Sequence, residues 1–519
     1  MAKVFNTAGL DAQMMRSLSA DEAANIYNGL DCCVTFEVYE ALAAELEDSP
    51  ECVKQTYADA LAKQAVFLDI SMRGIRVDDA ARKRAQGELK ARLAILEKRF
   101  QRIMQEIFGF GLNWNSPTQL KTLFYGSMGL REIKTRNANG QYVSTVNEKA
   151  LNQIGLNFYA KPLVSFILTM RELSKKISWL DTEIDPDRRM RTNINVAGTK
   201  TGRLSSSAND FGTGTNLQNV DNTMRYPFVA DPKQVLVNID LEQADARNVG
   251  AILWTIFLEE HGPEAAGKYL DACESGDLHT VVCAMAWPEL AWPDPWEPKA
   301  ARAIADAPAY RGMSYRDLAK RLGHGTNYLG TPRTMAAHTQ TETSIIEQFQ
   351  HRYFAAAPLI PAWHSWVVEQ LKTVGFLTTL YGRRRFFFGR ASDATTHREA
   401  VAYAPQSMTG HQIDMGLLNV WRNYPQAELL MQVHDSILLQ VPWLNHDSHI
   451  EKVMKLLPYE IELIGGRRFS VPLEAQIGWN WGKAKIKDGK ITDNPYGLVV
   501  WPDRFGRSPA PTNRLKDFL

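Results

Sequence analysis

The sequence has no apolar run that approaches the roughly 18 residues needed to cross a bilayer. Its first residues, MAKVFNTAGLDAQMMRSLSADE, lack the basic-then-apolar pattern of a secretory signal, so we expect a cytoplasmic protein without a membrane partner. It has only five cysteines and no Cys-x-x-Cys pair, which argues against a disulfide framework and a structural zinc site. An excess of one charge is also lacking, because 59 Lys and Arg oppose 58 Asp and Glu. If the protein binds a nucleic acid, local basic patches would have to contact the phosphates.

Two aspartates lie beside apolar, β-prone segments. QVLVNID (234–240) predicts a buried strand that ends at Asp240, and LLMQVHDSILLQV (429–441) predicts two strands with Asp435 at the bend. An ionised carboxylate in apolar surroundings is costly unless it is paired or bound to a metal. Two such carboxylates suit two Mg²⁺ ions, which activate an attacking oxygen and stabilise a leaving one. For either aspartate alone, a strand-end residue that caps a turn is the competing interpretation.

A second pattern lies in RDLAKRLGHGTNYLG (316–330), where Arg316, Lys320, His324 and Tyr328 recur at every fourth position. In a helix of 3.6 residues per turn these side chains form a slowly winding stripe. Two cations followed by two rings suit a triphosphate followed by a base. An ordinary solvated helix with aromatic packing at one end is the competing interpretation.

The remaining pattern is mainly helical in the first 200 residues. Apolar spacing predicts helices over 88–108 and 161–182, and NSPTQL (115–120) predicts a helix start with Ser116 as N-cap. Small and hydroxyl residues predict a loop at 201–207, and a helix is expected to begin near Gln243. Residues 284–312 are rich in Trp and Pro without a clear period, so we expect an irregular insertion.

Taken in order, several segments resemble those of the family A DNA polymerases, the group typified by bacterial DNA polymerase I and many phage replicases. The resemblance runs from about residue 54 to near 485. The segments are RGIRVD (73–78), NSPTQLKTLFY (115–125), VSTVNEKAL (143–151), RELSKK (171–176), TGRLSSS (201–207), NLQNV (216–220), IDLEQADAR (239–247), GDLHT (276–280), RDLAKRLGHGTNY (316–328), LYGRRRFF (380–387) and QVHDS (432–436). Each segment is modestly specific, and eleven in this order are highly specific.

The resemblance implies an α+β fold with the right-hand architecture of polymerases: a helical thumb, a palm with an antiparallel sheet, and helical fingers. The boundaries that it implies are a remnant of an exonuclease-like domain at 1–53, the thumb with the approach to the palm at 54–200, the palm at 201–270 and 401–485, the fingers at 271–400, and a tail at 486–519. Within this tail, we interpret the proline-punctuated segment WPDRFGRSPAPTNRLKDFL (501–519) as a flexible arm in preference to a docking peptide.

The resemblance also implies roles for individual residues. Asp240 and Asp435, with the backbone carbonyl of Leu241, match the ligands of two Mg²⁺ ions, for which Mn²⁺ is an alternative. Arg316 and Lys320 match the cations that hold the incoming triphosphate, and Lys320 joins the two aspartates as a catalytic residue. The other matches to nucleotide-binding positions are Gln243, Asp245, His279, His324 and Tyr328. The matches to positions near the primer–template are Arg203, Asn216, Asn219, Arg247, Gln406 and His434.

Four positions depart from the family's pattern. His324 stands where Phe or Tyr is usual, which predicts altered discrimination between nucleotide sugars or bases. Asp245 replaces the usual Glu that helps to exclude a ribose 2′-hydroxyl, so rejection of ribonucleotides is in question. Ser436 replaces a peripheral carboxylate beside Asp435. The segment APQSMTGHQID (404–414) fits its family counterpart only with an insertion, which leaves the assignment of Gln406 open.

The N-terminal segment has its own resemblance. Tyr27-x-x-x-Asp31, followed by a helical run, is similar to the last motif of a proofreading 3′–5′ exonuclease domain, but the earlier Asp-x-Glu motif is absent upstream. One aspartate cannot hold two metals, so we expect no proofreading by this chain alone. Two explanations stay open: a separate exonuclease or replisome subunit that completes the site, or a vestige.

These features predict a DNA-directed DNA polymerase, with primer–template DNA and deoxynucleoside triphosphates as partners, in phage-type replication. A single-subunit RNA polymerase shares a similar palm, and Asp245 keeps that alternative open. A non-catalytic primer–template binding protein would not need both Asp240 and Asp435. A metal-dependent nuclease would have no use for the stripe from Arg316 to Tyr328.

Overall fold

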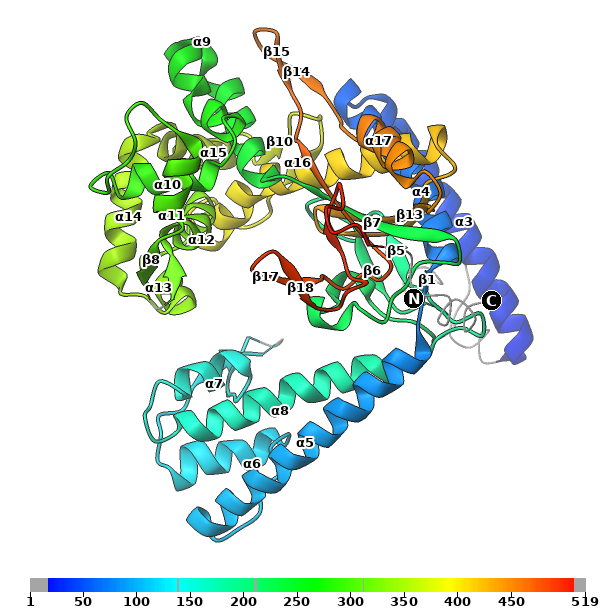
Figure 1. Ribbon diagram of the computed structural model, residues 1–519. Helices are drawn as coiled ribbons and strands as arrows, with labels where there is room; N and C mark the ends of the chain where they lie inside the picture. The colour runs from blue at the N-terminus through cyan, green and yellow to red at the C-terminus, as the bar shows by residue number, and fades with distance from the viewer. Residues whose placement is uncertain (1–16, 138–139, 210–211, 311, 508–519) are drawn as a thin grey trace.

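The computed structural model describes residues 17–137, 140–209, 212–310 and 312–507. Helices predominate, and one antiparallel sheet lies at the centre, so the α+β class is confirmed (Figure 1). A two-helix arm and a cluster of helices lie on either side of a hollow that the sheet closes. Within the described ranges, no helix combines the length and apolar character needed to span a membrane.

The two-helix arm is the thumb, formed by α5 (Asp79–Phe108) and α8 (Lys161–Leu180). The side chain of Asp78 caps the start of α5, and Gly109 ends it in the left-handed conformation. Both helices agree with the sequence prediction, as does Ser116, whose side chain caps the next helix. The elements at the tip of the arm are α6 (Pro117–Lys121), η1 (Thr122–Ser127), β2 (Lys134–Arg136), β3 (Tyr142–Ser144) and α7 (Glu148–Ile154).

The central sheet is the palm and has the strand order β12-β13-β7-β16-β19. Its strands are β7 (Gln234–Leu241), β12 (Glu428–Val433), β13 (Ser436–Pro442), β16 (Leu473–Gly478) and β19 (Val499–Val500). The apolar runs at 234–240 and 429–441 therefore form strands as predicted. They are almost wholly buried, because helices cover one side of the sheet and the thumb base covers the other.

Four helices pack around the palm sheet: α4 (Glu51–Arg73), α9 (Ala244–Glu274), α16 (Ala394–Asn423) and α17 (His446–Leu456). Lys63 of α4 forms an ion pair of 2.9 Å with Asp414 of α16, and both side chains are buried. A buried pair of this kind fixes which helix faces meet, because removing one partner would leave an uncompensated charge.

The fingers are the helical cluster on the far side of the hollow. Their helices are α10 (Leu278–Ala286), α11 (Pro298–Ala305), α12 (Tyr315–Asn327), α13 (Pro332–Thr339), α14 (Thr343–Ala356) and α15 (Leu359–Thr373). The expectation that 284–312 is irregular is wrong in part, since α11 and strand β8 (Pro308–Tyr310) lie within it. Pro298 takes the first turn of α11, where its missing N–H is harmless, and Glu297 caps the helix.

Several short two-stranded ribbons connect these parts. They are β1 (Ile75–Arg76) with β4 (Arg189–Met190), β5 (Asn193–Asn195) with β6 (Ser205–Ser207), β8 with β9 (Met313–Ser314), β10 (Phe376–Thr378) with β11 (Arg384–Phe386), and β14 (Ile461–Leu463) with β15 (Arg467–Phe469). The loop expected at 201–207 therefore contains a short strand. Its polar Ser-rich sequence hides the pairing with β5, which only the tertiary fold supplies.

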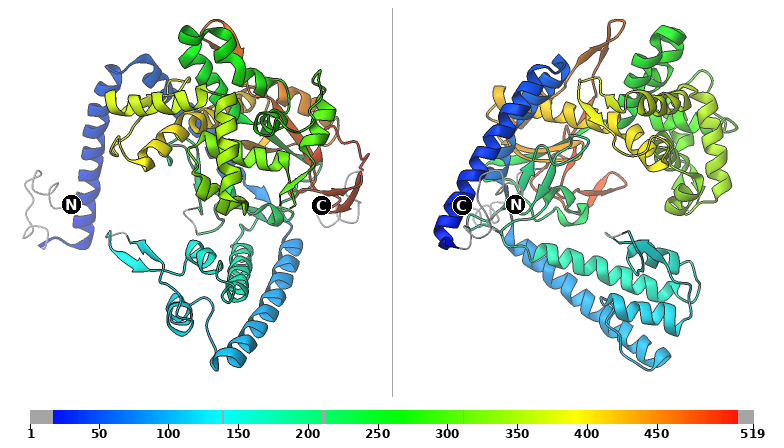
Figure 2. Two further views of the ribbon diagram at one scale, coloured as in Figure 1. Left: turned by 90° about the vertical axis from the view of Figure 1, so that its left-hand side faces the viewer. Right: turned by 180° about the vertical axis from the view of Figure 1, so that it is seen from behind.

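The N-terminal helix α3 (Ala20–Glu47) runs along the outer edge of the molecule (Figure 2). Ser19 and Glu22 form a capping box at its start. The helix contains Tyr27 and Asp31 and buries none of its side chains. Residues 1–16 of the predicted exonuclease remnant lie outside the described ranges.

The C-terminal segment is packed rather than arm-like as far as Arg507. Strands β17 (Lys485–Lys487) and β18 (Lys490–Asp493) form a hairpin, and β19 then adds an edge strand to the palm sheet. The Arg507 guanidinium donates to the backbone carbonyls of Ile477 and Gly497. The expectation of a flexible arm at 501–519 is wrong for 501–507, and 508–519 lie outside the described residues.

Candidate active site

Asp240 and Asp435 lie side by side at the ends of neighbouring palm strands. Asp240 is paired in register with Ser436 across β7 and β13, and the Leu241 amide donates to the Asp435 carbonyl at 3.0 Å. His434 and Asp435 form the turn between β12 and β13, with His434 in the left-handed region at φ 57°. Both carboxylates line one pocket of about 200 Å³. The fold thus brings together two residues that are remote in the sequence.

The electrostatics of this pair are unfavourable without a cation. Burial raises the pKa of Asp240, and the charge of Asp435 raises it further. Asn238 donates to Asp240 at 3.2 Å, and Glu474 faces Asp240 from β16 on the other side. Carboxylate oxygens that repel one another in a partly buried pocket fit a hard divalent cation, which would also keep water and substrate phosphates as ligands.

A complete protein-only metal cage is not present in the described ranges, where no three His, Cys, Asp or Glu side chains cluster for an ion. This agrees with the chemistry of Mg²⁺, which is commonly held by one or two carboxylates together with substrate phosphates. Leu241 follows Asp240 in β7, so its backbone lies beside the pair.

Sequence reasoning missed two cations at this pocket, Arg225 and Lys483. The Arg225 guanidinium lies 4.3 Å from the Trp481 ring centre, and burial lowers its pKa. Lys483 is exposed, and its charge favours ionised Asp240. No local signal could have found either residue, because each reaches the pocket from a loop that is remote from both aspartates. The sequence could have indicated Asn238, since it lies two residues before Asp240 and therefore on the same face of the strand.

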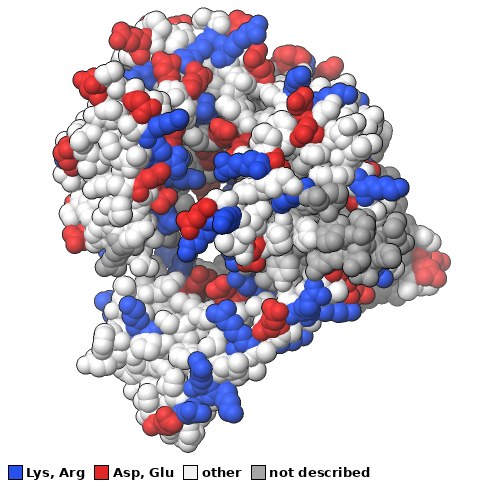
Figure 3. Space-filling view, in the orientation of Figure 1, with Lys and Arg blue, Asp and Glu red and all other residues white. Residues whose placement is uncertain are grey.

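The predicted stripe of Arg316, Lys320 and His324 lies on helix α12, which is at the side of the helical cluster nearer the palm sheet (Figure 1). Ser314 caps the start of this helix by accepting from the Asp317 amide. Tyr328 follows its last residue, so the stripe extends just beyond the helix. In Figure 3, basic side chains gather around the hollow between this helical cluster and the palm.

Arg316 is held in place by a carboxylate of the fingers. Its Nε and Nη2 donate to the two oxygens of Asp277 at 2.8 and 3.0 Å. Burial opposes ionisation of Asp277, yet the hydrogen bonds and charge of Arg316 hold its pKa well below the usual range. Lys320 lies one turn further along, is exposed, and has no ion pair with a described carboxylate.

His279 lies beside the same cations at the start of α10. Burial lowers its pKa to about 4, and the charges of Arg316 and Lys320 contribute to this shift. Its imidazole is therefore neutral at pH 7. The fold brings together three of the residues predicted to surround the incoming triphosphate.

A third group lies where α12 ends. The rings of His324 and Tyr328 meet edge to face at 4.8 Å. Burial raises the pKa of Tyr328 well above 10, and the charge of nearby Asp245 raises it further. Arg203 donates to Asp245 at 3.3 Å and to the backbone carbonyl of Gln406 at 3.0 Å. Five sequence-predicted residues thus surround one patch between α12 and the palm, although Gln406 takes part there only through its backbone.

The other predicted contacts are less concentrated. Asn216 accepts a hydrogen bond from Ser206 at 2.6 Å, and Asn219 is exposed one short turn later. Gln243 precedes α9 in the left-handed region. Arg247 is only 4% exposed and donates to the Glu242 carbonyl, so it serves the interior in this structure.

A sequence model of DNA polymerase family A matches residues 80–253 and 297–483, which together exceed half of the chain. The chain belongs to DNA polymerase family A. This family A chain resembles thermostable DNA polymerase I of Thermus filiformis and of Thermus aquaticus, each 29% identical over 447 residues. Each of these alignments covers 81% of this chain and 47% of the relative.

DNA polymerase I of Chloroflexus aurantiacus is 26% identical over 486 residues, which cover 89% of this chain and 46% of the relative. The family A chain thus spans about half the length of the curated relatives it matches. A solved structure, the POL domain of Pol1 from M. smegmatis in complex with DNA primer-template and dNTP, is 20% identical with a TM-score of 0.63. That likeness covers 81% of this chain and 69% of the other, and it confirms the predicted right-hand fold.

Three parts of this family A chain lie outside the matched residues. They are 1–79, then 254–296, which contains Asp277 and His279, and finally 484–519, which includes the β17–β18 hairpin. The predicted role of His279 therefore depends on its position beside Arg316 and Lys320.

Proposed function

We propose that this family A chain is a DNA-directed DNA polymerase that extends a primer 3′ end by two-metal nucleotidyl transfer. The observation that carries the proposal is the meeting of Asp240 and Asp435 at adjacent strand ends, in one pocket, with the pKa of Asp240 raised by burial and by its neighbour. Two carboxylates that destabilise each other are stabilised when they share divalent cations.

Asp240 and Asp435, with the Leu241 carbonyl, would hold the ions. When bound, Mg²⁺ would favour ionisation of the primer 3′-hydroxyl and would offset the charge that develops on the leaving pyrophosphate. The protein's own contribution is then mostly positioning, which is the larger part of catalysis in phosphoryl and nucleotidyl transfer.

Helix α12 supports the role of binding the triphosphate. Lys320 is free to contact phosphate oxygens, while Arg316 is oriented by Asp277. His279, neutral at pH 7, donates one N–H without adding charge. The rings of His324 and Tyr328 offer faces for the base and sugar, and Asp245 with Arg203 lies beside them.

Primer extension on one primer–template, with each dNTP or each NTP and with or without Mg²⁺, tests the proposal. We expect template-directed extension with dNTPs that disappears when Mg²⁺ is chelated. Extension with NTPs at a similar rate would favour an RNA polymerase instead. Tight primer–template binding with no extension would favour a non-catalytic binding protein, and degradation of the primer would favour a nuclease.

Two further parts of the proposal rest on the resemblance of the sequence to family A DNA polymerases. A role in phage-type replication and the absence of proofreading by this chain alone are part of the proposal. Degradation of DNA 3′ ends by the pure protein, abolished by Asp31→Ala, would contradict the second of these.

A further inference from the structure

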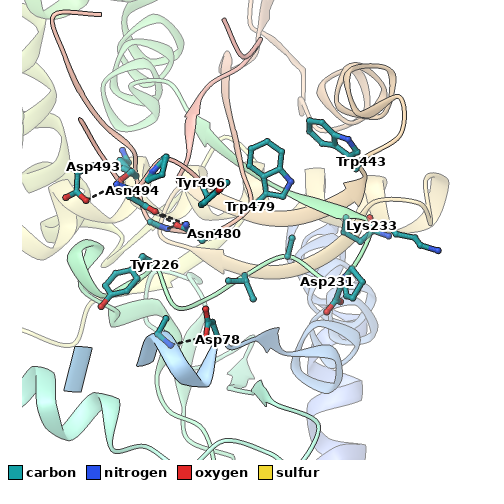
Figure 4. Close-up of a pocket in the computed structure, with 18 of the residues that line it drawn as sticks. Asp78, Tyr226, Asp231, Lys233, Trp443, Trp479, Asn480, Asp493, Asn494 and Tyr496 are labelled. Atoms are coloured by element: carbon teal, nitrogen blue, oxygen red, sulfur yellow. Dashed lines mark hydrogen bonds between the residues drawn. The ribbon is translucent and has the colours of Figure 1, made fainter. Parts of the chain in front are cut away.

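A cavity of about 1190 Å³ lies beside the catalytic pocket and shares Asn222 and Lys483 with it. The base of the thumb, the loop before β7 and the segment after β16 form its walls (Figure 4). Its volume exceeds the roughly 300–1,000 Å³ of cavities that hold one small ligand. The cavity therefore has room for a longer occupant that begins near Asp240.

One wall of this cavity comes from residues that lie beyond the family match, which ends at 483. Asp493, Asn494 and Tyr496 belong to this wall. It is held firmly, since the Trp479 amide donates to the Tyr496 carbonyl at 2.8 Å and the Leu498 amide donates to the Gly482 carbonyl at 2.7 Å. The cavity is thus a preformed feature of this chain.

The carboxylates that line the cavity are already satisfied within the protein. Asp78 caps helix α5, Asp231 is paired with Arg189, and Asp493 is paired with Lys485. Their charges are largely compensated, so they do not repel an anionic ligand as isolated carboxylates would.

Three lining cations have no such partner. Arg84 near the start of α5, Lys233 in the loop before β7, and Lys483 on the side of the catalytic pocket form no ion pair with any described carboxylate. The cavity therefore presents uncompensated positive charge at both the thumb wall and the catalytic end.

Aromatic side chains supply the remaining chemistry. In Figure 4, Tyr496, Trp479 and Trp443 follow one another along the cavity and Tyr226 lies apart from them; all four are partly exposed. The ring centres of Trp443 and Trp479 are 5.0 Å apart, and those of Trp479 and Tyr496 are 6.3 Å apart. One face of Trp443 is covered by the ring of His446, so the other face is the one that a base can reach. Partly exposed rings with cations nearby are the usual platform for unpaired bases, whose faces are free to stack.

We propose that this cavity binds several unpaired nucleotides of a DNA strand, with bases on these partly exposed rings and phosphates near Arg84 and Lys483. The proposal deepens the polymerase function and rests on it. A paired duplex fits less well, because its base faces are already stacked on one another. The site would hold single-stranded DNA next to the catalytic pocket.

Fluorescence anisotropy of the full chain with labelled dT12 tests this site. We expect the double variant Tyr226→Leu, Trp443→Leu to bind dT12 about tenfold more weakly than the wild type, while binding of a blunt 12-base-pair duplex changes less than twofold. Arg84→Gln should lower the slope of log Kd against log salt for dT12 by about 0.7.

The matched control is Trp296→Leu, which removes a tryptophan that is 45% exposed and outside the cavity. Thermal melting identifies variants that fail to fold, and Tyr496→Leu provides a second test of the rings. Equal dT12 binding by wild type and folded ring variants would overturn the proposal. This assay measures binding without extension. A failure of the proposed polymerase function would be detected separately, as absence of extension of a primer annealed to a longer template.

Discussion

The palm strand ends bring negative charges together, whereas the face of helix α12 brings positive charges together. At the palm, Asp240 and Asp435 share a pocket, and the pKa of Asp240 is raised by burial and by its neighbour. On α12, Arg316 and Lys320 lie near His279, whose pKa falls to about 4 through burial and these positive charges. One surface is poised for cations and the other for anions.

The two surfaces also differ in how far other groups of the protein compensate their charges. The fingers provide Asp277, which pairs with Arg316 through two hydrogen bonds. For Asp240 the palm provides the amide of Asn238, the side chain of Ser436 and the charges of Lys483 and Arg225, but no ion pair with a described cation. The palm therefore depends more strongly on an added ligand, and we expect changes there to have larger effects on the reaction.

The largest expected effect is that of Asp435→Asn. Removing one of two charges that would hold the metals should lower the primer-extension rate by at least about a hundredfold, with little loss of primer–template binding. Single-turnover extension and an anisotropy titration measure the two quantities. Glu451→Gln on α17 is a matched neutralisation outside the pocket, and equal rates for the two variants would break the comparison.

Lys320→Ala should come next. Loss of a charge-assisted contact with the triphosphate should reduce kcat/KM for dNTPs by about tenfold to a hundredfold. Arg321→Ala is the control, because it removes the adjacent exposed cation from a different face of α12. Similar kinetic losses for both variants would mean that general positive charge matters and the stripe does not.

A smaller effect is expected from His324→Phe. The imidazole is smaller and more polar than the usual ring, so the variant should change the ratio of dNTP to dideoxynucleotide incorporation by about threefold or more. The ratio is measured on one template under competition. His338→Phe on α13 is a control at an exposed histidine, and an unchanged ratio in His324→Phe would remove the idea.

The smallest expected effect is a shift in the titration of His279. Lys320→Ala removes a positive charge, so the pKa of His279 should rise from about 4 while staying below the ordinary 6.5, because burial still opposes the charged form. Since the folded-state pKa is the lower one, His279 contributes stability above pH 6.5 that is lost as the pH falls towards 4. NMR of labelled histidine measures this pKa. An unchanged pKa of His279 in Lys320→Ala would mean that the charge of Lys320 does not act on His279.

The palm strands were predictable, whereas much of what surrounds them was not. Apolar β-prone runs indicated β7, β12 and β13, and the register of their pairing brings Asp240 next to Asp435. The four-residue spacing indicated the stripe on α12 in the same way. Both signals are local, since they arise from the period of one strand or helix.

The missed features depend on tertiary contacts. Arg225 and Lys483 reach the catalytic pocket from loops whose sequences carry no period. Strand β19 follows a hairpin and precedes Pro502, so its sequence resembles a loop until β16 offers a partner. Helix α11 is only eight residues long and depends on its cap and buried alanines. The resemblance supplied site roles that no such local pattern could provide.

The central claim is that Asp240 and Asp435 together hold the divalent ions beside the incoming nucleotide. Electron paramagnetic resonance of Mn²⁺, titrated into the chain with a dideoxy-terminated primer–template and the matching dNTP, tests it directly. We predict two bound ions for the wild type and loss of both tight sites in the double variant Asp240→Asn, Asp435→Asn. Unchanged Mn²⁺ binding in a folded double variant would contradict the account.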